Sequence, residues 1–132
     1  MNKIFFTVVL TAALGFFPEP FEKKARAEED VQGVAVEDLT ADPSRFDGAR
    51  VRLVGFVRMT LAGDVIYPSE EASHDPEKGI WLVIQDQEVL KNRSRYDGYY
   101  CLAEGKVNAA NKGRMGRSVA ALEEIRTFER WG

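Results

Sequence analysis

Five residues occur twice in this chain, fifty positions apart, and each copy stands before a stretch with the pattern of a β-strand. The copies are SRFDG at residues 44–48 and SRYDG at residues 94–98, and another glycine follows each of them, at Gly55 and Gly105. Asp-Gly pairs favour tight turns, and a glycine inside a strand marks a bend, a bulge or a close backbone approach. The repeat therefore predicts two equivalent units, each a corner followed by a bent strand. A shared steric requirement and a duplicated segment both explain the match.

The stretch after the first corner, ARVRLVGFVRMTL at residues 49–61, alternates between two sets of side chains. A strand places successive side chains on opposite faces, so a period of two predicts one buried and one outward face. The set expected to face inward is Val51, Leu53, Gly55, Val57, Met59 and Leu61. The set expected to face outward is Arg50, Arg52, Val54, Phe56, Arg58 and Thr60.

The rest of the chain reads as one short helix and four further strands. The helix covers residues 36–41 and ends before Pro43, and the next strands are VIYPS, IWLVIQ and YYCLAEGKV, with one or two helical turns around Val89 and Leu90 between the last two. In YYCLAEGKV the residues expected inward are Tyr99, Cys101, Ala103, Gly105 and Val107. The closing segment, residues 117–131, fits a helix or a bulged strand, and we predict a strand because a barrel needs a closing partner.

One short helix followed by five strands, with glycines at the bends, predicts an all-β, five-stranded OB-like Greek-key barrel. The stretches FDGARVRLVGFV, IYPSEE, IWL and YDGYYCLAEGKVNAANKGRMG also resemble a family of exported bacterial OB-fold proteins of uncharacterised function. Members of that family often carry a histidine at the position of Arg114. The resemblance implies a fold and an exported compartment, and it implies no activity.

The first part of the chain has the pattern of a secretory signal. Lys3 precedes an uncharged run at residues 4–17, which is shorter than the roughly 20 residues needed to cross a bilayer. The triplet Ala25-Arg26-Ala27 offers a cleavage site, and cleavage after Gly15 or an uncleaved anchor are the alternatives. We therefore expect a signal peptide at 1–27, a mobile acidic linker at 28–35, an OB-fold domain at 36–132 and a periplasmic or secreted location.

Charge and cysteine content restrict the partners. The net charge of −3 becomes −5 if residues 1–27 are removed, since they hold four basic and two acidic residues, and this weighs against nucleic acid, whose binding depends on accumulated positive charge. The charge is uneven, with an acidic excess in residues 28–90 and a basic excess in residues 91–132. Cys101 is the only cysteine, so no disulfide can form within the chain. Its apolar setting predicts a buried thiol.

Two groups of residues are candidates for binding a partner. On the outward face of the first strand, arginines beside aromatic side chains are what OB-folds use to hold chain-like ligands. In the glycine-rich loop after the fourth strand, backbone amides and guanidinium groups could receive an anion. The residues of the first group are Arg50, Arg52, Phe56, Arg58 and Trp81, and those of the second are Arg114 and Arg117. The alternative is a barrel surface kept soluble by arginines, with Glu104 neutralising one of them.

Catalytic and metal-binding patterns are weak. His74 is the sole histidine, in a polar loop with Glu70, Glu71, Asp75 and Glu77, and transition-metal sites usually need several ligands at fixed spacing. A nucleophilic triad would need His74 as its base, with no strand to orient it. We expect no metal, no cofactor and no enzymatic activity.

The sequence thus favours an exported, non-enzymatic OB-fold module that binds a protein or an envelope component through its outer sheet face and loops. The alternative is a periplasmic inhibitor or immunity-like protein that blocks an enzyme with the acidic loop at residues 68–79. We expect no membrane span after cleavage of the leader. The sequence leaves the partner and the oligomeric state open.

Overall fold

A computed structural model describes residues 30–132, and its folded unit is Val31–Gly132. The predicted signal peptide lies outside these residues. The helices are α3 (Val36–Ala41) and α4 (Gln87–Lys91), and the strands are β1 (Gln32–Gly33), β2 (Arg50–Thr60), β3 (Gly63–Tyr67), β4 (Ile80–Leu82), β5 (Tyr99–Asn108) and β6 (Ala120–Arg130). Four short 3-10 turns complete the elements: η1 (Pro43–Phe46), η2 (Glu71–His74), η3 (Pro76–Lys78) and η4 (Arg93–Arg95). No helix among these residues is long and apolar enough to span a membrane.

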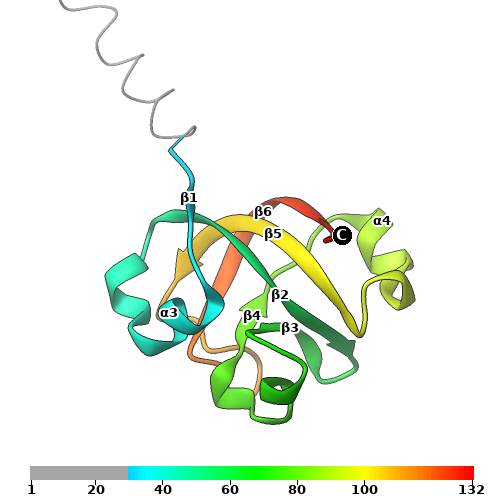
Figure 1. Cartoon of the computed structure of the whole chain (residues 1–132), viewed down its shortest axis with the longest axis horizontal. Coiled ribbons are helices and arrows are strands. Elements are labelled where there is room, and N and C mark those ends of the chain that lie inside the picture. Colours follow the sequence, from blue (N-terminus) through cyan, green and yellow to red (C-terminus); the bar gives the residue numbers. More distant parts are fainter. Residues whose placement is uncertain (1–29) are drawn as a thin grey trace, which may run out of the picture. The chain divides into compact units, whose positions relative to one another are not determined.

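Strands β2 to β6 close into a barrel in the order β2-β3-β4-β6-β5, because β5 pairs with β2 again (Figure 1). The β4–β6 pair is parallel and the other four pairs of the barrel are antiparallel. The predicted all-β, five-stranded OB-like fold is confirmed. The closing segment is a strand, because β6 pairs with β4 along one edge and with β5 along the other. A helix could not form these two hydrogen-bonded ladders.

The barrel interior is filled by alternate residues of each strand. In β2 the inward set is buried as predicted, with Val51, Leu53 and Val57 fully enclosed. Cys101 and Ala103 of β5 meet this set across the β2–β5 ladder, where they pair with Gly55 and Leu53. Val36 and Leu39 place the apolar face of α3 against the same core, which is why this six-residue helix has a defined place.

The two copies of the repeat form matching corners at opposite ends of the β2–β5 pair (Figure 1). Gly48 and Gly98 both adopt left-handed φ angles, of 82° and 83°. The Gly48 N–H donates to the Val107 carbonyl, and the Gly98 N–H donates to the Val57 carbonyl, each at 2.8 Å. Each corner thus caps the far end of the other unit's strand.

The aspartates of the repeat also accept hydrogen bonds from the far end of the other unit's strand. Oδ1 of Asp47 accepts the N–H of Ala109, and Oδ1 of Asp97 accepts the N–H of Met59, both at 2.8 Å. The pairing Leu53↔Ala103 lies at the centre of this arrangement, since these residues are also fifty positions apart. The repeat therefore corresponds to a local two-fold relation between the two corner-and-strand units.

The bend glycines lie where another strand passes close. A Cβ built on Gly55 would lie 2.4 Å from the Tyr67 carbonyl oxygen, and one on Gly105 would lie 2.7 Å from the Glu123 carbonyl oxygen. Opposite Gly105 the β5–β6 register shifts, and Glu124 in β6 has a φ of 50°. The predicted bend in β5 is thus matched by a bulge in β6.

Four details differ from the sequence-based expectation. Gln32 and Gly33 pair in parallel with β2, so the ordered unit begins at Val31, inside the predicted mobile linker. Leu61 is 99% exposed, because β2 ends at Thr60 and the chain turns there. Tyr99 is 44% exposed and faces Arg130, whose guanidinium lies 4.0 Å from the ring centroid. The third barrel strand is only Ile80–Leu82, shorter than IWLVIQ.

Candidate functional site

Arg50 and Arg52, at the start of β2, form ion pairs on the outer sheet face. Arg50 donates to the carbonyl and the carboxylate of Glu124 at 3.2 and 3.3 Å, and only 10% of its side chain is exposed. Arg50 therefore stabilises the β6 bulge, and its guanidinium group is not available to a partner. Arg52 pairs with Glu104 at 3.3 Å across the ladder, as the alternative interpretation of this face anticipated.

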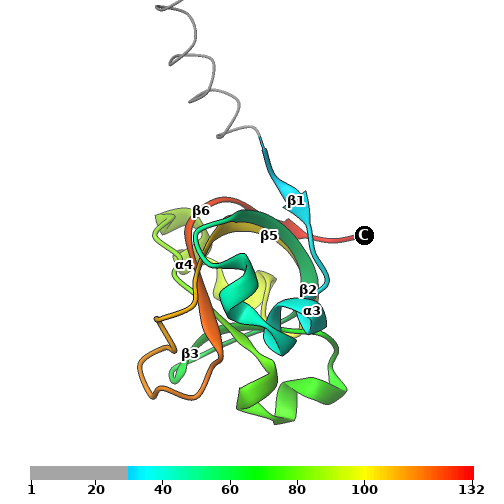
Figure 2. The same ribbon diagram turned by 90° about the vertical axis from the view of Figure 1, so that its left-hand side faces the viewer.

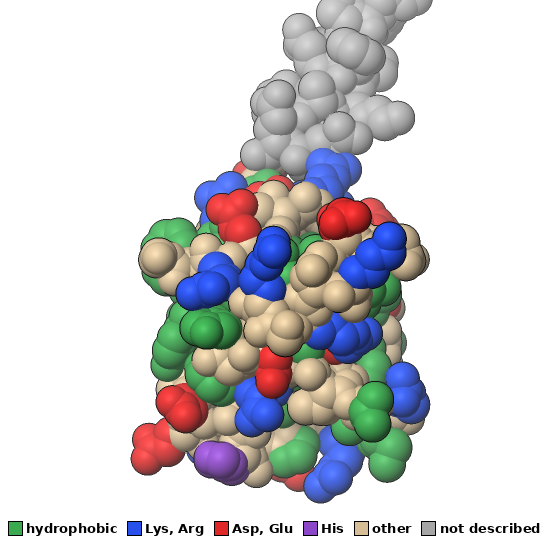
Figure 3. Space-filling view, turned by 90° about the vertical axis from the view of Figure 1, so that its right-hand side faces the viewer, with side chains coloured by type: hydrophobic (Ala, Val, Ile, Leu, Met, Phe, Trp, Pro, Cys, Tyr) green, Lys and Arg blue, Asp and Glu red, His purple; other side chains and the backbone are tan. Residues whose placement is uncertain are grey.

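Phe56 does not present a surface for stacking. It leaves β2 on the outer side, but only 6% of it is exposed, and its ring meets the edge of Tyr100 at a centroid distance of 5.5 Å. Phe56, predicted to bind a partner, is therefore not on the surface, because Tyr100 of the neighbouring strand packs against it. On the face at the α4 end, Lys and Arg side chains are interspersed with acidic ones and form no continuous patch (Figure 3).

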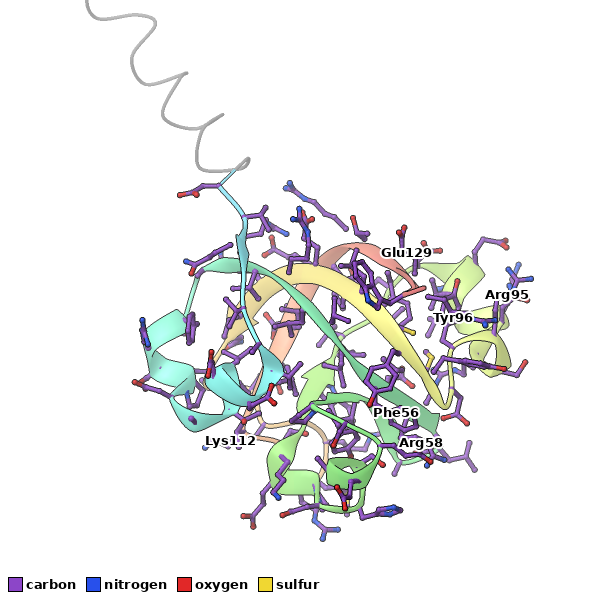
Figure 4. The ribbon with its side chains drawn as sticks, viewed as in Figure 1. Phe56, Arg58, Arg95, Tyr96, Lys112 and Glu129 are labelled. Atoms are coloured by element: carbon purple, nitrogen blue, oxygen red, sulfur yellow. The ribbon has the colours of Figure 1, made fainter. Side chains whose placement is uncertain are left out.

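Three of the predicted residues, Arg58, Trp81 and Arg117, do converge. They line a pocket of about 230 Å³ together with residues of β3 and the loops around it. The remaining lining residues are Thr60, Ala62, Gly63, Val65, Tyr67, Ser73, Pro76, Lys112, Met115 and Ser118. Arg58 lies on β2 and Lys112 on the β5–β6 loop, both in the half of the barrel that carries β3 and β4 (Figure 4).

The pocket is walled by two loops that close on Trp81. Ile80 and Leu82 point into the core, so the indole between them points outward, as predicted. A Cβ on Gly63 would lie 2.2 Å from the indole, and one on Gly113 would lie 2.6 Å from it. Both glycines have positive φ, so the sequence permits a backbone approach to the ring that other residues would block.

The β5–β6 loop, residues 109–119, is ordered by its own hydrogen bonds. Oε2 of Glu123 accepts from the side-chain amides of Asn108 and Asn111 at 3.0 and 2.9 Å, and the Ser118 N–H donates to the Lys112 carbonyl at 3.1 Å. Arg114 donates to the Leu61 carbonyl at 3.5 Å, which ties this loop to the β2–β3 turn beside it (Figure 2). The pocket is thus bounded by preformed walls.

The electrostatics of the pocket favour an anion. Arg58, Lys112 and Arg117 supply three cations, and the lining contains no aspartate or glutamate. Arg58 already pairs with Asp97 at 3.0 Å, whereas the structure places no carboxylate within ion-pair distance of Lys112 or Arg117 among residues 30–132. Burial raises the pKa of Tyr67, and the charge of Arg58 opposes that rise. The nearby Asp75 carboxylate adds to the rise, and Arg117 opposes it more weakly.

Arg114 lies at a second pocket on the other side of Trp81. There it accompanies Asp64, which is 8% exposed and paired with Arg93. Burial raises the pKa of Asp64 above its ordinary value, and the charges of Arg93 and Arg114 reduce that rise. The two arginines of the glycine-rich loop therefore serve different pockets, since Arg117 lines the first and Arg114 the second.

The acidic loop between β3 and β4 is built from the 3-10 turns η2 and η3. Asp75 accepts the Glu77 N–H at 3.0 Å and so caps η3, and His74 is exposed at the end of η2. No group of three or more His, Cys, Asp or Glu side chains in residues 30–132 is arranged to hold a metal ion. Cys101 is buried, as expected, and burial raises its pKa to about 11.

Sequence reasoning missed ten of the lining residues, among them Tyr67, Lys112 and Ser118. Tyr67 ends β3, whereas Lys112 and Ser118 lie on the β5–β6 loop, and the sequence gives no spacing that relates β3 to this loop. Tyr67 lies on the second barrel strand, part of the strand face that OB-folds use for binding, and this was the one available signal. No protein-family model matches this chain, and no curated protein is similar to it.

Proposed function

We propose that this protein is an exported, non-enzymatic binding module, and that it takes its ligand in the pocket formed by β3, β4, the β2–β3 turn and the β5–β6 loop. The observation that carries this proposal is the convergence of Arg58, Trp81 and Arg117 on one concave surface whose own lining holds three cations and no carboxylate. In the OB-fold, the face of the second and third barrel strands and the loops beside it are the usual binding surface. Here those strands are β3 and β4.

The pocket's chemistry supports binding over catalysis. Its lining holds no carboxylate, imidazole or thiol, so the serines Ser73 and Ser118 have no such group in the lining to activate them as nucleophiles. The single cysteine is buried with a raised pKa, and the single histidine lies exposed in the β3–β4 loop. The export part of the proposal rests on the apolar run at residues 4–17 and the triplet Ala25-Arg26-Ala27.

The test is capture of a ligand from envelope extract by the purified protein, compared with two variants of equal charge change. The pocket variant is Lys112→Gln with Arg117→Gln, and the sheet-face variant is Arg52→Gln with Arg126→Gln, both pairs with exposed side chains. We expect the pocket variant to lose capture, because it removes both unpaired cations of the pocket, and the sheet-face variant to keep it. Loss in the sheet-face variant alone would place binding on the outer sheet face and contradict the proposal.

An inhibitor-like function is the second candidate, because the acidic loop is ordered and its carboxylates are exposed. Glu70, Glu71 and Glu77 are exposed, whereas Asp75 has a structural role as the cap of η3. Neutralising Glu70, Glu71 and Glu77 to glutamine should abolish capture of a target enzyme if the loop is the inhibitory element. The binding-module proposal expects that variant to bind as the wild type does.

A further inference from the structure

Two hydroxyl groups in the pocket are held by buried side chains and have no protein partner. Tyr67 and Ser118 are each only 7% exposed, and both line the pocket. Neither hydroxyl makes a hydrogen bond to another residue in the described part of the chain, and no side-chain oxygen there is both enclosed and unpaired. Both oxygens therefore open into the pocket. Each oxygen can therefore form a hydrogen bond with water or with a ligand in the pocket.

The cations of the pocket stand beside these hydroxyls. Arg117 is next to Ser118 in the chain and lies near the Tyr67 phenol, where its charge lowers the phenol pKa against the larger effects of burial and Asp75, which raise it. Lys112 is joined to Ser118 by the loop hydrogen bond at 3.1 Å. A guanidinium group binds a carboxylate through two parallel N–H donors, which makes Arg117 suited to a planar anion.

Part of the pocket wall is apolar, and the pocket is small. Val65, Pro76, Trp81 and Met115 supply the apolar surface. At about 230 Å³, the pocket is smaller than the roughly 300–1,000 Å³ of a pocket for a drug-sized ligand. By itself it has room for a single ring with its substituents. An adjoining pocket shares Lys112, Arg117 and Ser118 with it and carries the acidic residues Asp75 and Glu77.

We propose that the pocket binds one carboxylated sugar ring, a hexuronate unit, either free or within a polysaccharide. The planar carboxylate of a hexuronate would pair with Arg117 and Lys112, and its hydroxyl groups would hydrogen-bond to Tyr67 and Ser118. The apolar face of its ring would pack against the apolar wall that includes Trp81. This inference rests on the proposed function and specifies its ligand. The oligosaccharide-binding use of the same face in OB-folds agrees with it.

The experiment is isothermal titration of the purified full chain with galacturonate and glucuronate and with their short oligomers. The matched probes are galactose and glucose, which lack the carboxylate, and glucose 6-phosphate, which carries a phosphate instead. We expect at least one uronate to bind ten times more tightly than its neutral sugar, since hydrogen bonds to charged groups are the stronger ones. Equal binding of the neutral sugars, tighter binding of the sugar phosphate, or no binding of any uronate would each overturn the inference.

Three variants tie the binding to this pocket. Tyr67→Phe removes only an oxygen without a protein partner, so the melting temperature should stay the same while uronate affinity falls about tenfold. Arg117→Gln should reduce affinity at least as much, whereas Arg126→Gln, an exposed arginine on β6, should leave it unchanged. Unaltered affinity in Tyr67→Phe and Arg117→Gln would place the sugar elsewhere and refute the inference.

The two proposals can fail separately. If envelope capture depends on Lys112 and Arg117 but no uronate binds, the ligand is of another class and only this inference is lost. Capture of a protein whose binding is not reduced by any of the sugars would also refute only this inference. If neither capture nor sugar binding depends on the pocket, the proposed function is lost as well.

Discussion

Replacing Gly55 with alanine should destabilise the barrel by forcing two strands apart. Gly55 lies in β2 on the inward face, and an added Cβ would lie 2.4 Å from the carbonyl oxygen of Tyr67 and 2.8 Å from Cγ1 of Ile66. The Ile66 side chain has limited freedom to turn, because it is fully buried. The Tyr67 oxygen belongs to the backbone of β3, so it can move only if the β2–β3 ladder shifts.

The size of the effect follows from two opposing contributions. Overpacking a well-packed core typically costs about 1–3 kcal/mol. Against this, alanine restricts the unfolded chain and stabilises the protein by about 0.4–1 kcal/mol where its conformation is tolerated. The expected net loss in the free energy of unfolding is about 1–2 kcal/mol. In a domain of this size, that corresponds to a fall in melting temperature of roughly 5–15 °C.

The assay is urea and thermal unfolding of the purified protein, with Gly33→Ala as the matched control. Gly33 lies in β1, has nothing within 4 Å of an added Cβ and does not need a left-handed φ. Its replacement should leave the melting temperature unchanged or raise it by a few degrees. Gly105→Ala, whose Cβ would meet the Glu123 carbonyl oxygen at 2.7 Å, should behave like Gly55→Ala. If Gly55→Ala and Gly105→Ala melt at or above the temperature of Gly33→Ala, the argument for close strand approach at the repeat is refuted.

The corner aspartates should differ in urea unfolding. Asp97→Ala should lower the free energy of unfolding by about 1–3 kcal/mol, because it removes the acceptor of the Met59 N–H and of the Arg58 Nε–H. Asp47→Ala should lower it less, because it removes the acceptor of one N–H only. Equal losses in the two variants would contradict this. Asp64 should make stability depend on pH: its pKa is raised on folding, so the folded state holds the proton more tightly and the free energy of unfolding falls as pH rises above the ordinary value of 3.8. Asp64→Asn should remove that fall in unfolding curves recorded from pH 3 to 7, and an unchanged slope would show that Asp64 is not its source. The Cys101 thiol, with its pKa raised to about 11, should resist iodoacetamide at pH 8 in the native protein and react in urea, as mass spectrometry would show.

The sequence alone determined the class of fold and much of its core. The alternation in β2 identified Val51, Leu53, Val57 and Met59 as buried, because a strand exposes its two faces with a fixed period of two. The repeat identified the two corners, because the left-handed φ at Gly48 and Gly98 is a requirement of the local backbone. These predictions depend only on residues close together in the chain.

The failures share a different cause. Phe56 is outward by alternation and yet buried, because Tyr100 from β5 covers it. Arg50 has the pattern of a solvated arginine, yet its guanidinium holds the Glu124 carbonyl of a bulge that lies 74 residues away in the chain. In both cases a partner distant in sequence decides what the side chain does.

Only part of the candidate site could be predicted from the sequence, for the same reason. Trp81 and Arg117 could be selected by residue type, but only barrel closure brings them to one pocket with Tyr67 and Ser118, whose hydroxyls carry the ligand proposal. Periodicity tells whether a side chain points inward or outward, and it does not tell which loops meet above it. That meeting is set by the β4–β6 and β2–β5 pairings, which join segments far apart in the chain and exist only in the folded barrel.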